Sequence, residues 1–377
     1  MKVAIVTQFP NDPATPRGGV EAVSVNLVKA LADFKDINLH VITLDDSCNS
    51  LDISSWNGVT IHRLPRGQGS VLINSISVWR RQISQYLTKL APDIVHAHDT
   101  YGIMVKGLQI PRVFTIHGFI YADTRVSKTR FAWLRSKLWQ WIETTSWADQ
   151  PHIISISPYV RERLTGIATG IIHDIDNPVS DAFFNIQKKE RKGTIFSASV
   201  VSKRKNTLNL IKAFATVIAE GYDAELRLAG PVVEPEYGIF VKNLISEYRL
   251  NDKVILLGQI SKNDIMEELS AASIFALVSL EEGSPMGIAE AMAAGVPVVT
   301  SNRCGMPYMV RHGESGFLVN PIDPSDIAQR MKQLLQDDGL RGLMGKYSHE
   351  IASNRFHPLI VAQRTREVYL EALKVKR

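Results

Sequence analysis

The segment LEEGSPMGIAEAMAAGVPVVT at residues 280–300 places two carboxylates, a glycine and a helix start within a short distance. The apolar run before it predicts a strand, which Glu282 and Gly283 interrupt. Ser284 suits an N-cap and Pro285 suits a first helical position, so we expect a helix that begins at Pro285. The amides of its first turn and the positive end of its dipole would hold phosphate or sugar oxygens near Glu282 and Gly283.

A second carboxylate, Glu290, lies about one and a half turns into this predicted helix. Its neighbours are Ala289, Ala291, Ala293 and Ala294, whose small side chains would let a ligand come close. A carboxylate in that position can accept two hydroxyls of a ribose. Two glutamates at this spacing also occur on ordinary helix surfaces, so the spacing alone is weak evidence.

The whole segment resembles the E-x7-E signature, here Glu282 to Glu290, of the retaining family-4 glycosyltransferases with the GT-B fold. The resemblance extends over nearly the full chain. KVAIVTQFP and RGGVEAVSVNLVKAL resemble that family's first strand, glycine loop and first helix. Further similar segments follow in order: DIVHAHD, VFTIHGF, ISISPYV, DNPV, KRKNTLNLIKAF, LRLAGP, VILLGQIS and HGESGFLVNP. The resemblance implies two Rossmann-like domains that face each other across a cleft, with a C-terminal helix crossing back to the N-terminal domain.

Composition is that of an ordinary globular protein of about two domains, with 377 residues of which 45% are hydrophobic and 21% charged. No apolar run approaches the roughly 18 residues that span a bilayer, and no signal peptide precedes the first strand, so we expect a cytoplasmic protein. Cys48 and Cys304 lack metal-ligand spacing and are expected to stay reduced. The formal charge of +5 favours an anionic partner, but the chain has no nucleic-acid-binding motif.

Apolar runs alternate with helical periodicities, a pattern typical of repeated βα units and an α/β fold. We predict an N-terminal, acceptor-side domain at 1–176, joined by a C-terminal helix at about 358–377, and a nucleotide-sugar-binding domain at 177–357. Ligands should lie at the carboxyl ends of the parallel strands. The predicted strands are 3–7, 39–44, 59–64, 94–97, 113–117 and 153–156, then 194–199, 225–229, 254–257, 274–278, 296–300 and 316–319.

Two loops are candidates for binding the donor diphosphate. Gly18 and Gly19 open a predicted helix after the first strand, where a backbone without Cβ atoms can approach phosphate; a merely flexible loop is the alternative. In the second domain, Lys205 matches the family's diphosphate-binding lysine, whereas Val200 stands where the family has an arginine. Arg204 is the expected substitute, because its planar guanidinium can bind phosphate through two hydrogen bonds. A solvated basic turn remains the alternative.

Histidines end two predicted strands of the N-terminal half. His117 follows an apolar strand and precedes a glycine, and the family resemblance implies a role beside the transferred sugar, although a packing histidine would give the same pattern. His98 and Asp99 close the preceding strand and are candidates for contacting the acceptor.

The segment RVSKTRFAWLRSKLWQWIETTSW at residues 125–147 combines basic residues with four tryptophans. This composition suits a helix that lies on an anionic membrane surface, and an amphipathic helix packed on the core fits it equally well. The predicted apolar face holds Phe131, Leu134, Leu138, Trp141 and Ile142, and the cations are Arg125, Lys128, Arg130, Arg135 and Lys137. Membrane contact would favour a lipid-linked acceptor.

A metal-dependent GT-A enzyme is the less favoured class. Asp174, Ile175 and Asp176 formally make a DxD motif, but they lead into Asn177 and Pro178, which resemble the interdomain segment of GT-B enzymes. We therefore expect no metal and no cofactor. A GT-B-like sugar-nucleotide epimerase and a non-catalytic glycan-binding or membrane-scaffold relative remain alternatives.

The resemblance implies a retaining glycosyltransferase that moves sugar from a UDP- or GDP-linked donor to a glycan or lipid-linked acceptor, in synthesis of a cell-surface polysaccharide, lipopolysaccharide or glycolipid. Lys205, Arg204 and the glycine-loop amides would meet the negative charge of the leaving phosphate. Glu282 would orient the sugar and Glu290 would hold the ribose. The predicted catalytic residues are His117, Lys205 and Glu282, and the predicted donor-binding residues are Gly18, Gly19, Arg204, Lys205, Gly283, Ser284, Pro285, Met286, Gly287 and Glu290.

Overall fold

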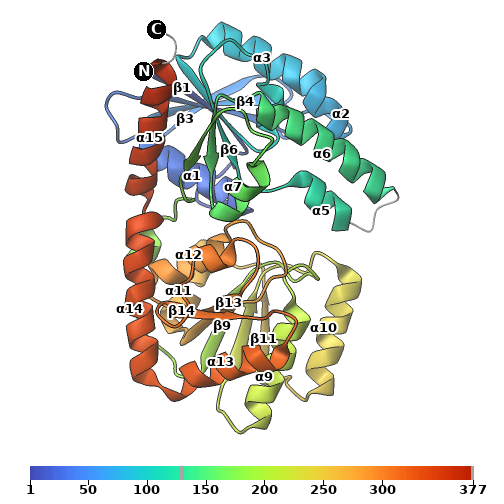
Figure 1. Ribbon diagram of the computed structural model, residues 1–377, viewed down its shortest axis with the longest axis vertical. Helices are drawn as coiled ribbons and strands as arrows, with labels where there is room; N and C mark the ends of the chain where they lie inside the picture. The colour runs from blue at the N-terminus through green and yellow to red at the C-terminus, as the bar shows by residue number, and fades with distance from the viewer. Residues whose placement is uncertain (127–130, 375–377) are drawn as a thin grey trace. The chain divides into compact units, whose positions relative to one another are not determined.

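The computed structural model describes residues 1–126 and 131–374. The chain divides into two compact units, the first made of Met1–Pro178 with Pro358–Arg377 and the second of Val179–His357 (Figure 1). Each unit is a parallel or mostly parallel β-sheet with helices on both faces, which is the architecture of a Rossmann-like domain.

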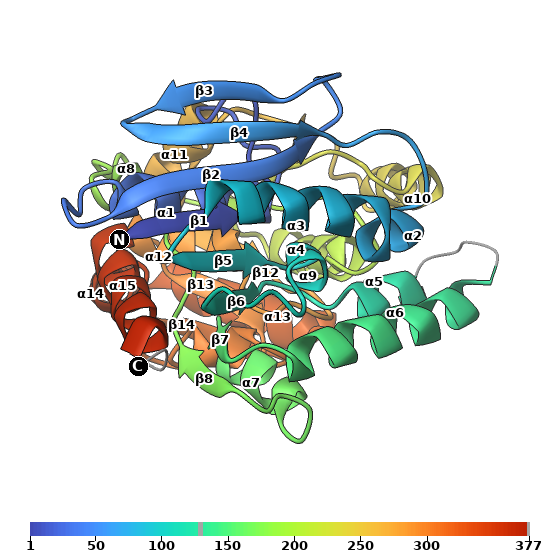
Figure 2. The same ribbon diagram turned by 90° about the horizontal axis from the view of Figure 1, so that it is seen from above.

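The first unit holds an eight-stranded sheet with the order β3-β4-β2-β1-β5-β6-β7-β8 (Figure 2). All neighbouring strands are parallel except β3 and β4, which are antiparallel. The strands are β1 Lys2–Val6, β2 Asn38–Asp45, β3 Asp52–Trp56, β4 Val59–Pro65, β5 Ile94–His98, β6 Arg112–Ile116, β7 His152–Ser155 and β8 Ile171–Asp174.

Side-chain alternation along these strands builds a core on each side of the sheet. In β1, Val3 and Ile5 pack with helices α1 (Gly19–Leu31) and α15 (Pro358–Lys374), while Ala4 and Val6 point to the opposite core. The C-terminal helix α15 therefore belongs to the first unit. The other helices of this unit are α2 Val71–Ile76, α3 Val78–Leu90, α4 Tyr101–Met104, α5 Ile120–Val126, α6 Ala132–Ala148 and α7 Pro158–Leu164.

The second unit holds a six-stranded, fully parallel sheet with the order β11-β10-β9-β12-β13-β14. Its strands are β9 Thr194–Ala198, β10 Glu225–Ala229, β11 Val254–Gly258, β12 Ile274–Leu277, β13 Val298–Ser301 and β14 Gly316–Val319. Its helices are α8 Asp181–Phe184, α9 Thr207–Ala219, α10 Pro235–Glu247, α11 Lys262–Ala271, α12 Met286–Ala293, the 3-10 turn η1 Met306–Tyr308, α13 Pro324–Gln336 and α14 Asp338–Arg355.

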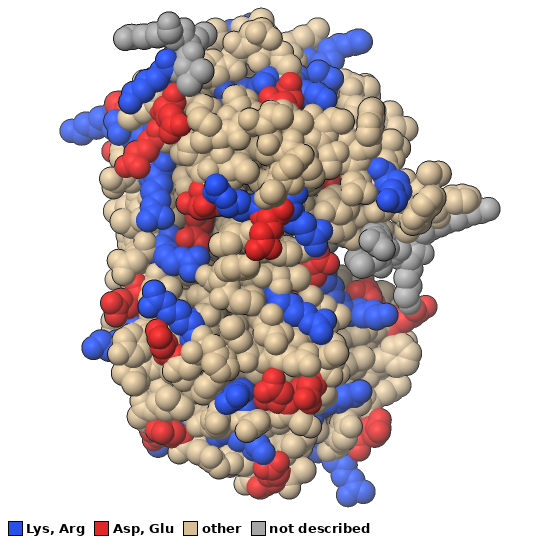
Figure 3. Space-filling model, viewed as in Figure 1, with Lys and Arg blue, Asp and Glu red and all other residues tan. Residues whose placement is uncertain are grey.

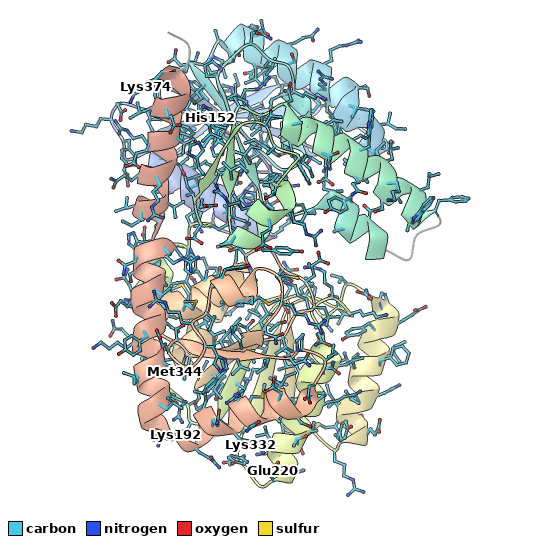
Figure 4. The ribbon with its side chains drawn as sticks, viewed as in Figure 1. His152, Lys192, Glu220, Lys332, Met344 and Lys374 are labelled. Carbon is cyan, nitrogen blue, oxygen red and sulfur yellow. The ribbon has the colours of Figure 1, made fainter. Side chains whose placement is uncertain are left out.

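Local signals explain where several helices of this unit begin. Ser261 and Asp264 form a reciprocal capping box at the start of α11, and the side chain of Asp323 accepts amide hydrogen bonds at the start of α13. Helix α13 is further held beside α9 by Lys332, whose Nζ lies 2.7 Å from a carboxylate oxygen of Glu220 (Figure 4).

Two strands, β3 and β8, were not predicted from the sequence, and residues 125–147 do not form the single helix that was predicted. β3 and β8 lie at the two edges of the first sheet, where most of their residues are not buried, so they lack the apolar run that marks an inner strand. Residues 125–147 are not one continuous helix, because Phe131 has a left-handed conformation, with φ of 62°, and α6 begins after it at Ala132. Lys128, Arg130 and the side chain of Arg125 lie outside the described part of the chain.

Candidate active site

Strand order alone marks a ligand-binding edge in each unit. In the second sheet the chain runs from β9 outward through β10 to β11, and then returns to the other side of β9 with β12. Ligands of such sheets bind beyond the carboxyl ends of the strands where the order reverses, which here means after β9 and β12. The same reversal occurs in the first sheet between β1 and β5. Most of the loops that the sequence singles out follow these four strands, and His117 follows β6, the neighbour of β5.

Three charged side chains meet at the reversal point of the second sheet. Nζ of Lys205 lies 2.5 Å from Oε1 of Glu282, and Nη1 of Arg204 lies 2.7 Å from the same oxygen. Arg204 also donates to the carbonyl oxygen of Glu281, at 2.9 Å. Lys205 and Glu282 have side chains only 13% and 11% exposed, whereas Arg204 is 37% exposed. One carboxylate contacts two cations, so the group keeps a net positive charge. Val200 is partly exposed in the same loop.

Asn206 fixes the backbone that presents these cations. It adopts a left-handed conformation, with φ of 60°, and its Nδ2 donates to Val278 O at 3.0 Å and to Pro321 O at 2.6 Å. Asparagine tolerates this conformation better than most residues do. The loop after β9 is thereby tied to the end of β12, and Lys205 and Glu282 are brought together.

The first turn of α12 approaches β9 closely. A Cβ on Gly287 would lie 3.0 Å from the carbonyl oxygen of Ala198, so a larger residue would push the helix away from the strand. The first hydrogen bonds within the helix are donated by the amides of Ile288 and Ala289 to the carbonyl oxygen of Pro285. The amides of Met286 and Gly287 come before these bonds and are not used within the helix. This helix start can accommodate an anion beside Lys205 and Arg204.

The predicted start of this helix needs a correction. Pro285 has an extended conformation, with φ of −68° and ψ of 122°, and is itself the N-cap, so α12 begins at Met286. Ser284 makes no capping hydrogen bond, and its hydroxyl instead contacts Sδ of Met309 at 3.9 Å. Gly305 packs directly against the backbone of Gly283. A Cβ atom on Gly305 would lie 1.8 Å from the carbonyl oxygen of Gly283, so this position has no room for a side chain.

Glu290 is a carboxylate whose charge is poorly compensated within the chain. Burial raises its pKa to about 7, and the positive charge of Lys262 works against that rise. The backbone carbonyl of Glu290 accepts a hydrogen bond from the amide of Ala294, but among the described residues none forms a hydrogen bond or ion pair with its carboxylate. Such a group has unused hydrogen-bonding capacity for a ligand.

In the first unit, the glycine loop begins helix α1 after β1. Gly18 is the N-cap and has an extended backbone that any residue could adopt, so its conformation does not itself require glycine. No atom of the described residues lies within 4 Å of where its Cβ would be. The carboxylate of Glu21 accepts a hydrogen bond from the amide of Arg17, at 2.7 Å, and so orders the approach to the helix.

The histidine at the end of β6 is held by two neighbours. Nε2 of His117 lies 2.9 Å from Nδ1 of His98, and the amide of His117 donates to Oδ1 of Asp99 at 2.8 Å. Burial lowers the pKa of His117, and the Asp99 carboxylate opposes this shift. Burial also drives the pKa of His98 well below its usual value, so the pair is neutral near pH 7. His98 is only 1% exposed and contacts His117 directly.

A third histidine, His96, extends this group into the core and was not singled out from the sequence. Its Nδ1 lies 2.7 Å from the hydroxyl of Tyr369 on α15, and its Nε2 lies 2.7 Å from Oγ1 of Thr115. The rings of His96 and His98 have centroids 4.5 Å apart. His96 and His98 are two residues apart in a strand, so both rings lie on the same face of the sheet. This spacing is the feature of the sequence from which the pairing could have been predicted.

Helix α6 carries apolar side chains on an exposed face as well as on its buried one. Trp133 is 68% exposed and Trp141 64%, and Phe131, Leu134 and Leu138 are also exposed. The prediction that Ile142 shares this face is wrong, because Ile142 is buried with Trp139 against Ile103. Glu143 connects α6 to the loop after β6, since its carboxylate accepts hydrogen bonds from the amides of Ile120 and Tyr121.

Charge is distributed rather than gathered on the face drawn in Figure 3. Basic and acidic side chains are interspersed there, and the outer end of α6, at the right of the view, is drawn mostly in tan. None of the helices within the described residues is long and apolar enough to cross a membrane.

Two Rossmann-like domains in one chain are the architecture of GT-B glycosyltransferases. Family models match both domains: the model for glycosyltransferase family 4 matches residues 17–182, and the model for glycosyl transferases group 1 matches residues 179–351. The chain belongs to this family of glycosyltransferases.

Curated relatives include enzymes of polysaccharide synthesis. The capsular polysaccharide biosynthesis glycosyltransferase CapM of Staphylococcus aureus is 28% identical over an alignment 372 residues long, which covers 93% of this chain and 95% of that protein. The N-acetyl-alpha-D-glucosaminyl L-malate synthase of Bacillus anthracis is 28% identical over a match that covers 49% of this chain and 47% of that protein.

Solved structures share the fold at lower identity. Sucrose-phosphate synthase from Thermosynechococcus elongatus has a TM-score of 0.80 at 20% identity, and the match covers 99% of both chains. Anabaena Alr3699/HepE, solved in complex with UDP and glucose, has a TM-score of 0.75 at 18% identity, covering 98% of this chain and 100% of that one.

Proposed function

We propose that the protein transfers a sugar from a nucleoside diphosphate donor with retention of configuration and without a metal ion. The observation that carries this proposal is the convergence of Lys205 and Arg204 on Glu282, at the reversal point of the second sheet and beside the start of α12. A diphosphate needs positive charge and amide donors, and both are available at this position.

In this mechanism the second unit binds the donor. The diphosphate takes over Lys205 and Arg204 from Glu282, and the first-turn amides of α12 contribute further donors. The freed carboxylate of Glu282 accepts hydrogen bonds from sugar hydroxyls, while Glu290 accepts the ribose hydroxyls. Lys205 then meets the charge that develops on the β-phosphate as the glycosidic bond breaks.

Residues of the first unit complete the reaction in the proposal. Gly18 and Gly19 provide amides for the diphosphate, and neutral His117 forms a hydrogen bond with the transferred sugar. The departing phosphate oxygen accepts the proton of the acceptor hydroxyl as the new bond forms on the same face, so no separate base is required. His98 and Asp99, first considered as acceptor contacts, would act by holding His117 in position.

The proposed acceptor is a glycan or a lipid-linked glycan at a membrane surface. Support comes from the exposed aromatic face of α6, on which Trp133 and Trp141 lie with the exposed cations Arg135 and Lys137. Tryptophans of this kind settle at the headgroup level of a bilayer, and cations beside them attract anionic lipid. The relative CapM, a capsular polysaccharide enzyme, supports a polymer or its lipid-linked precursor as the product.

A donor panel tests this function. UDP- and GDP-linked sugars are screened by thermal shift and by release of the nucleoside diphosphate, with and without EDTA. We expect one donor to stabilise the protein and to be hydrolysed slowly in both conditions, and its anomeric configuration to be kept in the product. Loss of activity in EDTA while the protein stays folded would contradict the metal-free mechanism, and stabilisation without any turnover would favour a non-catalytic relative.

A further inference from the structure

Two histidines and a glutamate from three different elements lie together at one edge of the first unit. His152 begins β7, His173 lies in β8, and Glu371 lies on α15; one ligand atom from each falls within 4.8 Å of the other two. Nδ1 of His152 and Nε2 of His173 are 3.1 Å apart. Figure 4 labels His152 beside α15, together with Lys374 at the end of the described part of that helix.

The strand register places these side chains on the same face. His173 pairs with Ile154, which lies two residues after His152, so both histidines point to the side of the sheet that Ile154 occupies. Ile154 packs in the same core cluster as Val368 of α15. The helix therefore covers this face and brings Glu371 over the two rings.

The chemistry of this group suits a transition metal. In a tetrahedral site with metal–nitrogen bonds of about 2.0–2.1 Å, two ligand nitrogens lie roughly 3.3 Å apart, which is close to the observed spacing. Two imidazoles and one carboxylate favour zinc and similar cations over magnesium or calcium.

We propose that His152, His173 and Glu371 bind a zinc-type divalent cation, with water completing its coordination. His152 is buried, His173 is half-buried and Glu371 is exposed, so the position is anchored on the sheet yet open to an ion from solvent. The bound ion would join α15 to the last two strands of the sheet. This role is structural, separate from the proposed sugar transfer, and nothing in the transfer mechanism depends on it.

A second histidine pair in the same unit provides a matched control. Nδ1 of His40 lies 2.9 Å from Nε2 of His62, whose other nitrogen contacts the hydroxyl of Tyr86. In the described part of the chain this pair belongs to no group of three metal-binding side chains. This pair therefore tests whether the third ligand is needed: if two neighbouring histidines were enough to bind metal, His40 and His62 would bind it as well as His152 and His173 do.

The test is a metal titration of EDTA-treated, desalted protein. We expect one equivalent of Co²⁺ to give a visible absorption band that Zn²⁺ removes and Mg²⁺ does not. Zn²⁺ at about 100 times its Kd should raise the Tm by roughly 5 °C. His173→Ala should abolish both effects, Glu371→Gln should weaken binding at least about tenfold, and His40→Gln should change neither.

Far-UV circular dichroism and the metal-free Tm establish that each variant is folded. Should His173→Ala fail to fold, Glu371→Gln decides the question, because its side chain is exposed on α15. Equal binding by Glu371→Gln and the unaltered protein, or no stoichiometric binding by the unaltered protein, would overturn the proposal and leave a hydrogen-bonded histidine pair.

Discussion

Glu282 forms ion pairs with both Lys205 and Arg204 through a single carboxylate oxygen, Oε1. The two cations that the proposal assigns to the diphosphate are thus already satisfied in the ligand-free protein. Donor binding must exchange one anion for another. The exchange makes the role of Glu282 testable separately from that of Lys205.

Glu282→Gln should bind the product nucleoside diphosphate more tightly and turn over more slowly. Removing the carboxylate charge leaves Lys205 and Arg204 without their counter-ion, so an incoming diphosphate no longer competes with it. The sugar meanwhile loses a charged acceptor with two oxygens and meets an amide with one. We expect UDP or GDP affinity to rise several-fold, by about 1 kcal/mol or more, and kcat to fall. Calorimetry and steady-state kinetics measure the two changes. Weaker nucleotide binding would contradict the exchange.

Lys205→Ala should lower kcat more than it raises the KM of the donor, because the charge that Lys205 meets is greatest in the transition state. A loss of about 10²–10³ in kcat is the usual cost of removing one such group. Lys203→Ala is the matched control, since Lys203 is an exposed lysine of the same turn. Near-normal turnover of the Lys205 variant would assign the role to Arg204.

Donor affinity should depend on pH through Glu290. Its pKa of about 7 means that the carboxylate is mostly protonated at pH 6 and mostly ionised at pH 8. Since the ionised form accepts both ribose hydroxyls, affinity should rise by up to roughly tenfold over this range, with release of a proton. Calorimetry in buffers of different ionisation enthalpy detects that release.

Two Glu290 variants provide the controls. Glu290→Gln should flatten the pH dependence, and Glu290→Ala should weaken binding by about 1.5–3 kcal/mol. As pH rises, the contribution of Glu290 to the stability of the folded protein should fall while its contribution to donor affinity rises. The folded-state pKa lies above the usual value of 4.5, so this group's contribution to stability decreases as pH rises from about 4.5 through 7. Donor affinity that is independent of pH would remove Glu290 from the ribose site.

Replacing Arg135 and Lys137 by Glu should abolish binding to anionic vesicles and spare donor hydrolysis in solution. Each cation near such a surface contributes about 1 kcal/mol, and the reversal replaces attraction by repulsion. Arg130, which belongs to the same predicted basic stretch, lies outside the described residues. Vesicle flotation at low salt measures the binding.

The controls for this prediction separate charge from apolar contact. Glu substitution of Lys242 and Lys346, two exposed lysines of the second unit, should leave flotation unchanged. Trp133→Ser with Trp141→Ser should weaken binding even at high salt, where electrostatic attraction is screened. If the unaltered protein does not bind anionic vesicles at low salt, a soluble acceptor becomes the better proposal.

Strands whose residues are mostly buried were predictable, whether or not they lie at a sheet edge. The predicted strands at 225–229 and 316–319 coincide with the inner strand β10 and with the largely buried edge strand β14, whereas the more exposed edge strands β3 and β8 have no comparable apolar pattern. Gly287 was predicted beside a ligand, but its close approach to Ala198 depends on how α12 packs on β9. Sequence patterns carry local periodicity and cannot supply such a packing distance.

Contacts among the candidate residues were less predictable still. Lys205 and Glu282 are far apart in sequence, and they meet because the left-handed Asn206 ties two loops together. Similarly, His98 and His117 ended predicted strands, but their direct pairing depends on the register between β5 and β6. The sequence shows which side chains could bind a ligand, but only the tertiary structure shows which of them form ion pairs or ring contacts with one another.

The membership of α15 in the first unit has a consequence for synthesis on the ribosome. Val361, Ala362, Val368, Tyr369 and Ala372 complete a core whose other members come from the first part of the chain. That core remains open while the whole second unit is translated, although the second unit, being continuous, can fold as soon as it emerges. The first domain to be made is therefore the last to be finished, and a nascent chain halted before residue 361 would expose the apolar side of its sheet to chaperones.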